Sequence, residues 1–318
     1  MIKQTLYFGS PYYLSKKFEQ LIIKVPNAQG LDALSEFGKA PIEDLGLVVL
    51  DHPQITVSQG LLSALLANNV AIVTCDDRHH PAGLLLPLEG HHTQAKQIRA
   101  QMAASEPLKK QLWQQVVVAK ILNQAELLHQ MGRQHTPMLT FAKNVKSGDP
   151  ENYEARAAAY YWSNLFDKSL NFRRNRDGDP PNNLLNYGYA IVRALVARAV
   201  VGTGLLPILG IHHHNQYNAF ALADDLMEPF RPMVDKIVCE ILNTNSPYET
   251  LTKDLKARLL GVAEVDIKIK NERSPLLNAT HFVATSLVRC YEGTQRKLVL
   301  PSFVIKPNKT NDLQLPLD

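Results

Sequence analysis

The hydrophobic pattern of the chain changes in character near residue 90. Before that point, short runs rich in β-branched and aromatic residues are separated by Pro, Gly and Asn, which is typical of strands joined by turns. One helix interrupts them, over residues 60–69, with Ser58 as its N-terminal cap. The predicted strands span residues 4–10, 21–26, 45–51 and 70–75.

From Thr93 onward the segments are longer and richer in good helix formers, with apolar residues at helical spacing. We expect the last helix but one to kink or break around Pro229 and Pro232. Residues 298–307 read as extended, and residues 90–92 as the boundary between the two parts. The predicted helices span residues 95–105, 108–128, 150–166, 186–204, 222–243 and 275–293.

Composition narrows the class of protein. The 318 residues, 45% hydrophobic and 20% charged, indicate a soluble globular chain of one large domain or two ordinary ones. No apolar run approaches the roughly 18 residues of a membrane span, and the first residues lack an apolar signal region. The three cysteines, Cys75, Cys239 and Cys290, show no CxxC spacing, so we expect no disulfide framework and a cytoplasmic protein.

Charge is divided unevenly between the two parts. Residues 1–92 carry 6 Lys and Arg against 9 Asp and Glu, a net charge of −3. The remainder carries 28 against 21, a net charge of +7. A polyanionic partner would therefore bind the second part, although a solvated basic face would give the same count.

Residues 210–232 hold the first candidate site. Three consecutive histidines, His212 to His214, precede an acidic cluster of Asp224, Asp225 and Glu228. On a helix, Asp225 and Glu228 share one face, so a loop and a helix could converge on a cation. A solvated loop followed by a solvated helix face remains the alternative.

Two further features lie earlier in the chain. Glu154 stands in an Ala-rich helix that neighbouring helices can approach closely, and burial of a lone charge is costly unless a cation offsets it. A surface glutamate at a helix start is the alternative. Arg173, Arg174 and Arg176 precede a turn rich in Asp, Gly and Pro, which suits phosphate binding or a solvated basic loop.

In this order, the segments YEARAAAYYW, FRRNRDGDPPNNLLNYGYAI, GIHH and DLMEPFRP resemble the CRISPR adaptation integrases, the nearly universal Cas proteins of spacer acquisition. LDHPQITVSQGLLSALLANNVAIVTCD is similar to the amino-terminal domain of that family, so the resemblance covers most of the chain. In detail, the chain looks most like the form that accompanies a single-protein RNA-guided effector.

The resemblance implies a set of site residues. Glu154, His213 and Glu228 match the metal-binding and catalytic positions. Asp225 matches an acidic position that contributes in some family members, and we expect it to support the ligands here, with direct ligation as the alternative. One imidazole and two carboxylates suit Mg²⁺ or Mn²⁺. We expect phosphate contacts from DNA at Arg173, Arg174 and Arg231.

The resemblance also implies an α+β fold, with a small β-sandwich-like dimerisation domain over residues 1–90 and a larger all-α, metal-dependent catalytic domain over residues 93–318. The implied partners are double-stranded DNA (the fragment and the CRISPR repeat), a second copy of the chain, the small second adaptation Cas protein and the RNA-guided effector nuclease, with no membrane. The implied activity is insertion of short DNA fragments into the repeat by attack of a 3′-hydroxyl. A DNA-repair nuclease without integration and a non-catalytic DNA-binding scaffold are the alternatives.

Overall fold

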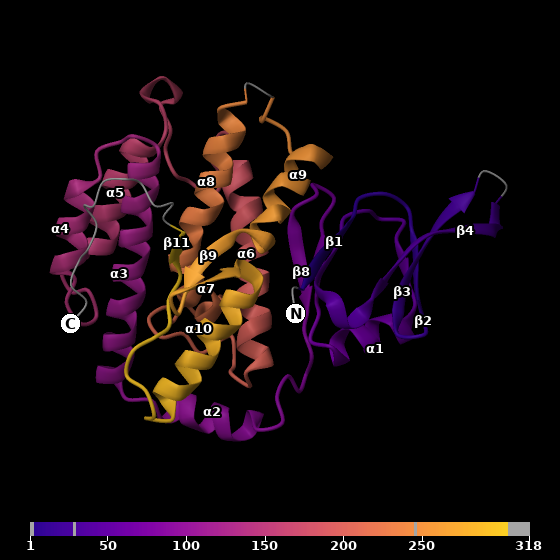
Figure 1. The fold of residues 1–318 in the computed structure, drawn as a ribbon, viewed down its shortest axis with the longest axis horizontal. Coiled ribbons are helices and arrows are strands. Elements are labelled where there is room, and N and C mark those ends of the chain that lie inside the picture. Colours follow the sequence, from indigo (N-terminus) through magenta and orange to yellow (C-terminus); the bar gives the residue numbers. More distant parts are fainter. Residues whose placement is uncertain (1–2, 28–29, 245–246, 305–318) are drawn as a thin grey trace.

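The computed structural model describes residues 3–27, 30–244 and 247–304. Strands of the amino-terminal part lie on one side of the molecule and a helical region forms the other (Figure 1). The predicted α+β class, with amino-terminal sheets followed by a helical carboxyl-terminal region, is confirmed.

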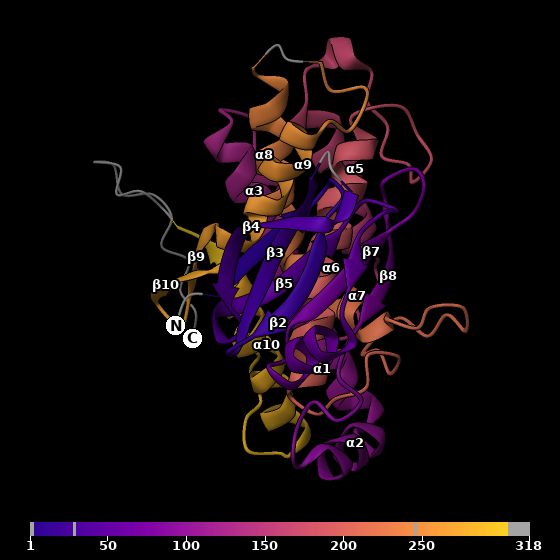
Figure 2. The ribbon, with the colours of Figure 1, turned by 90° about the vertical axis from the view of Figure 1, so that its right-hand side faces the viewer.

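Two four-stranded sheets build the amino-terminal part. The inner sheet, next to the helices, has parallel pairing between its first three strands and an antiparallel fourth; its order is β1 (Gln4–Phe8), β5 (Leu45–Leu50), β7 (Ala71–Cys75) and β8 (Pro81–Leu85). The outer sheet has the order β4 (Gly30–Pro41), β3 (Gln20–Asn27), β2 (Tyr13–Lys17) and β6 (Thr56–Val57). Seen from the right-hand side of Figure 1, the outer sheet lies in front and the helical region behind (Figure 2).

The inner sheet is buried on both faces. Successive side chains of a strand point to opposite faces, so Val48 enters a small core shared with helix α1 (Gln59–Ala67), whereas Leu47 and Val49 enter the large helical core. Ala71 and Val73 of β7 join the same large core. The two parts predicted from the sequence therefore share one sheet between two hydrophobic cores.

Helices α3 and α6 form the centre of the larger part. Most positions of α6 are buried, including Tyr187, Leu195 and Val200. The helices described are α2 (Gln94–Ala103), α3 (Glu106–Gln130), α4 (Thr136–Asn144), α5 (Tyr153–Leu165), α6 (Asn182–Gly202), α7 (Ala221–Met227), α8 (Arg231–Leu242), α9 (Lys253–Leu260) and α10 (Leu276–Tyr291). Three 3₁₀ turns accompany them: η2 (Lys168–Leu170), η3 (Glu228–Phe230) and η4 (Gly261–Glu264). Another, η1 (Ile42–Asp44), lies between β4 and β5 in the amino-terminal part.

Helix α6 bears on the expectation that no segment spans a membrane. By length and composition alone it is apolar enough to cross a bilayer, although Arg193 and Arg198 interrupt its apolar residues. In the structure 78% of its apolar window is buried inside the protein, as in the core helix of a globular fold.

The carboxyl-terminal part is not purely helical. A three-stranded sheet, in the order β10 (Glu272–Pro275), β9 (Asp266–Ile269) and β11 (Ser302–Phe303), packs within it. Lys270 and Asn271 have positive φ angles and form the two-residue turn between β9 and β10. Only the middle of the predicted extended tail is a strand, and residues 305–307 of it lie outside the described residues.

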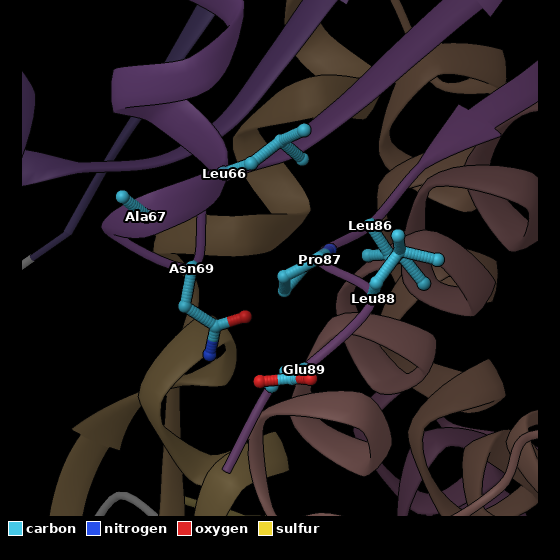
Figure 3. A pocket seen from close by; sticks show the side chains of 8 residues that line it. Leu66, Ala67, Asn69, Leu86, Pro87, Leu88 and Glu89 are labelled. Carbon is cyan, nitrogen blue, oxygen red and sulfur yellow. The ribbon is translucent and has the colours of Figure 1, made fainter. Parts of the chain in front are cut away.

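The segment between β8 and α2 lines a cavity of about 290 Å³ (Figure 3). Leu66 and Ala67 of α1 close one side and residues 86–90 close the other. Here the parts are tied together, because the Arg198 Nε of α6 donates to the Asn69 carbonyl at 2.5 Å. Gly90 lies so close to the Val201 carbonyl that a Cβ atom would stand 2.2 Å from its oxygen.

Candidate active site

Helix α5 presents Glu154 in its first turn. The Asp149 carboxylate accepts hydrogen bonds from the backbone N–H groups of Tyr153 and Glu154, both at 2.9 Å. Asn152, in the left-handed conformation, caps the helix by accepting from the Ala155 N–H. These caps fix where the helix begins and hence the position of Glu154.

Glu228 lies at the junction between α7 and η3. Pro229 follows it at once, and the chain turns there instead of continuing α7, as the sequence predicts for this proline. Asn123 of α3 secures the turn by donating to the Pro229 carbonyl at 2.7 Å and the Pro301 carbonyl at 3.0 Å. The Glu228 side chain is thereby held in the protein interior against α3.

A lysine joins the two glutamates. Lys120 Nζ on α3 lies 2.6 Å from Glu154 Oε1 and 2.5 Å from Glu228 Oε2, with only 11% of its side chain exposed. Arg231 Nε lies 2.9 Å from the other oxygen of Glu228. Two carboxylates from different helical segments thus converge on one ammonium group.

The electrostatics of this cluster favour charged side chains. Burial alone would raise the pKa of Glu228, but Arg231 and Lys120 outweigh it and hold the pKa below its ordinary value. Burial would lower the pKa of Lys120, yet Glu228 and Glu154 outweigh it and raise the pKa. The cluster is therefore an ion-pair network whose members depend on one another.

His213 is oriented by the deeply buried Asp225. Its Nδ1 lies 2.5 Å from Asp225 Oδ1, and the other oxygen of Asp225 accepts from the backbone N–H groups of Ile211 and His212 at 2.6 and 2.9 Å. The hydrogen bond with Asp225 raises the pKa of His213 despite burial, and Glu228 and Glu154 add to that effect. His213 thus lies in the electrostatic field of both glutamates.

The three histidines have different surroundings. His212 stacks on the buried ring of Trp113, with centroids 4.3 Å apart and planes inclined by 2°. Burial lowers the pKa of His212. His214 is exposed, and His213 meets the same Trp113 edge-on. Only His213 combines an anchored ring with a carboxylate partner on Nδ1.

The chemistry of these residues fits a divalent cation. A carboxylate that fixes one ring nitrogen of a histidine is a common support for a metal ligand at the other nitrogen. The buried Glu228 Oε2 has an ion-pair contact but no hydrogen bond of good geometry. In residues 3–27, 30–244 and 247–304, no three His, Cys, Asp or Glu side chains are placed to hold a metal ion together. Lys120 lies between the two glutamates.

The predicted DNA-contacting arginines differ in their contacts. Arg174 donates to the side-chain oxygens of Asn182 and Asn186, each at 2.8 Å, and is half-buried. Arg231 pairs with Glu228, whereas the Arg173 side chain is exposed. Contact with DNA stays a prediction for all three, with Arg174 and Arg231 already bound inside the protein.

Sequence reasoning missed two groups in this region. Lys120 interrupts the apolar run VVVAKIL of a long helix, and a charge in such a run signals a buried ion pair. Asp235 accepts hydrogen bonds from Tyr161 and Tyr189, and burial raises its pKa to about 6. The guanidinium groups of Arg174 and Arg231 both lie over the Tyr189 ring.

Comparison with known proteins gives a family match and a curated relative that agree with each other. The profile of the family described as CRISPR associated protein Cas1 matches residues 6–260. The chain is 38% identical over 267 residues to the CRISPR-associated endonuclease Cas1 of Neisseria meningitidis, covering 83% of this chain and 87% of that protein.

Solved structures share the fold. A casposase bound to its integration product superposes with a TM-score of 0.73 at 19% identity, over 94% of this chain and 92% of the casposase. A Cas6-RT-Cas1–Cas2 complex contains a chain that superposes with a TM-score of 0.70 at 19% identity, over 92% of this chain and 35% of that one.

Proposed function

Because this chain belongs to the CRISPR-associated Cas1 family, we propose that it is a metal-dependent DNA integrase and endonuclease. It inserts short foreign DNA fragments as spacers into a CRISPR array, by attack of a fragment 3′-hydroxyl on a phosphodiester of the repeat. The observation that carries the proposal is the convergence of Glu154 and Glu228 on one cation beside His213.

Glu154, His213 and Glu228 would hold Mg²⁺ or Mn²⁺. When bound, such an ion neutralises charge on a phosphate and lowers the pKa of an attacking hydroxyl or water. Asp225 keeps the His213 ring oriented through Nδ1, and the capped start of α5 keeps Glu154 in place. Phosphoryl transfer depends mainly on such positioning and on electrostatics, so a rigid site is what the reaction needs.

The three predicted DNA-contacting arginines have different roles in this proposal. Arg231 stands beside the site, where a guanidinium can pair with a phosphate as well as with Glu228. Arg173 is free of that constraint and is exposed to an approaching DNA backbone. Arg174 acts through the fold, since its two asparagine partners belong to the start of α6.

The assembly we propose is a homodimer that works with the small second adaptation protein and with the RNA-guided effector, in the cytoplasm. The Cas6-RT-Cas1–Cas2 complex, which contains a chain of the same fold, supports the small second adaptation protein as a partner. Phe18 and Phe37 expose 87% and 68% of their surface on the outer sheet and its turn, which supports a protein contact there. The three cysteines are free thiols, in keeping with a reducing compartment.

The test is a strand-transfer assay with full-length protein, Mn²⁺ and a repeat-containing target. Donor fragments with a 3′-hydroxyl should be joined to the target, and donors with a blocked 3′-end should not. Glu228→Gln should abolish joining while duplex binding persists. Equal cleavage of the target with both donors, without joining, would instead establish a nuclease that does not integrate. Binding without any chemistry would establish a scaffold.

A further inference from the structure

The position of Lys120 raises the question of how a metal ion would enter this site. Its ammonium group contacts one oxygen of Glu154 and one of Glu228 at 2.5–2.6 Å. A metal ion held by both glutamates would compete with Lys120 for these carboxylates. A monovalent side chain therefore occupies the point on which the two carboxylates converge.

We propose that Lys120 is an internal counter-ion of the metal-free protein, which a divalent cation displaces when it binds Glu154 and Glu228. The inference rests on the proposed function, because it takes these carboxylates to be metal ligands. It adds a competing, protein-bound cation to the site.

Two physical arguments carry the proposal. Without a cation, two carboxylates held together in a largely buried place would repel each other and lose their hydration, which is costly. Lys120, together with Arg231 at the other oxygen of Glu228, offsets that cost in the metal-free state. An ammonium group and a divalent ion cannot both contact the same oxygens, because like charges at such short separation repel strongly.

The side chain can leave without disturbing the helix that carries it. Lysine has a flexible four-carbon stem, so its ammonium group can withdraw while the backbone stays in place. Asn123, one turn further along α3, holds that helix to the carbonyls of Pro229 and Pro301. Trp113, two turns before Lys120 on the same face, packs against His212 and His213. Displacement therefore changes one rotamer and leaves the ligand-bearing turns in position.

A competing internal cation lowers the apparent affinity for metal, since only the fraction of molecules with Lys120 withdrawn can bind. Removing the charge should have two opposite effects. The metal-free protein should unfold at a lower temperature, and Mn²⁺ should bind more tightly, by about tenfold or more. A lysine that merely supported the fold would lower the melting temperature without tightening metal binding.

The experiment measures free Mn²⁺ by electron paramagnetic resonance in titrations of the full-length protein without DNA. Lys120→Met should bind Mn²⁺ more tightly than wild type, and Mn²⁺ should raise its melting temperature by more. Lys120→Arg, which keeps the charge, should bind no more tightly than wild type. Affinity in Lys120→Met equal to or below that of wild type would overturn the proposal, as would equally tight binding by Lys120→Arg.

Two controls separate this inference from the proposed function. Lys256→Met removes another buried, paired lysine, and should lower the melting temperature without changing Mn²⁺ affinity. Glu228→Gln should lose the Mn²⁺ site. If Glu228→Gln binds like wild type, the metal site itself is wrong and the displacement fails with it. If Glu228→Gln loses binding but Lys120→Met gains none, only the displacement is wrong.

Discussion

Two largely buried lysines, Lys256 and Lys120, differ in the number of carboxylates that each contacts. Lys256 of α9 is 2.6 Å from Asp51 Oδ2, and Asp51 also accepts from the Tyr7 hydroxyl at 2.6 Å and contacts His79 Nδ1 at 2.8 Å. There, one carboxylate is surrounded by several donors. Around Lys120, one ammonium group is shared by two carboxylates.

The difference separates a structural ion pair from an exchangeable one. Burial would raise the pKa of Asp51, but the hydrogen bonds from Lys256, Tyr7 and His79 hold it below its ordinary value. The oxygens of Asp51 already contact these three partners and leave little room for another cation. Its ion pair with Lys256 joins the end of β5 in the inner sheet to α9. Arg231 pairs with the other oxygen of Glu228, so Lys120 is the cation that the two glutamates share. Two carboxylates that share one cation can pass to a divalent ion together, whereas Asp51 is a single carboxylate that already has three partners.

The largest expected effect concerns the ligand set. Glu154→Ala, His213→Ala and Glu228→Ala should each reduce strand transfer by about 10³-fold or more, because metal ligation supplies several kcal/mol and about 1.4 kcal/mol is a factor of ten. His212→Ala and His214→Ala should retain most activity. The measurement is the initial rate of joining in Mn²⁺. A dispensable His213 with an essential His212 would move the ligand assignment by one residue.

The structural pair should give the largest effect on folding. Lys256→Met leaves the Asp51 carboxylate buried without its cation, which should lower the free energy of unfolding by about 3–5 kcal/mol. Adding Asp51→Asn to it should recover part of that loss, since the unpaired charge is then gone. Urea unfolding of the single and double variants measures both. A double variant that is less stable than Lys256→Met would contradict this assignment.

A further buried carboxylate, Asp235, extends the comparison of the two lysine clusters, because tyrosine hydroxyl groups and not a lysine donate hydrogen bonds to it. Its pKa is raised to about 6 in the folded protein, above the ordinary value of 3.8. The folded state therefore binds the proton more tightly, and its stability should decrease as the pH rises from about 4 to about 6, by about 2–3 kcal/mol.

Urea unfolding of wild type and Asp235→Asn across pH 4–7 isolates that contribution. The difference between their unfolding free energies should change over this range and be constant above it. A difference that does not vary with pH would mean that Asp235 titrates alike in the folded and unfolded chains.

The smallest effect should come from Arg173, which has an exposed side chain. Arg173→Ala should weaken duplex binding modestly and reduce the slope of log K against log salt concentration by about one, as expected for a single phosphate contact. Arg78→Ala, at an exposed arginine of the acidic amino-terminal part, is the matched control and should leave the slope unchanged. Equal slopes for Arg173→Ala and wild type would remove Arg173 from the DNA interface.

Much of the fold could be predicted from the sequence because local patterns decide it. The strands of the inner sheet are short apolar runs, and Pro229 ends α7 where expected. The hairpin of β9 and β10 was not predicted, although β9 alternates and ends just before Lys270 and Asn271, because both strands are short and β10 is polar. Two short helices, α4 and α9, were not predicted because neither is long enough to show a sustained apolar face.

In the candidate site, by contrast, local patterns indicated residues but not the contacts between them. Residue types and motif order indicated Glu154, His213 and Glu228, but no local pattern relates positions 154 and 228 to position 120. The contact among them depends on how α3 packs against α5 and η3, which is a property of the tertiary fold. The role of Asp225 as the partner of His213 Nδ1 likewise required the loop geometry.

The doubly buried inner sheet has a consequence for synthesis of the chain. Leu47, Val49, Ala71 and Val73 are translated early, whereas α6, a central helix of the core that covers them, follows roughly a hundred residues later. At about 5–20 residues per second, that apolar face waits on the order of ten seconds for its cover. Before then the nascent sheet offers an aggregation-prone surface, which a chaperone at the ribosome is suited to shield.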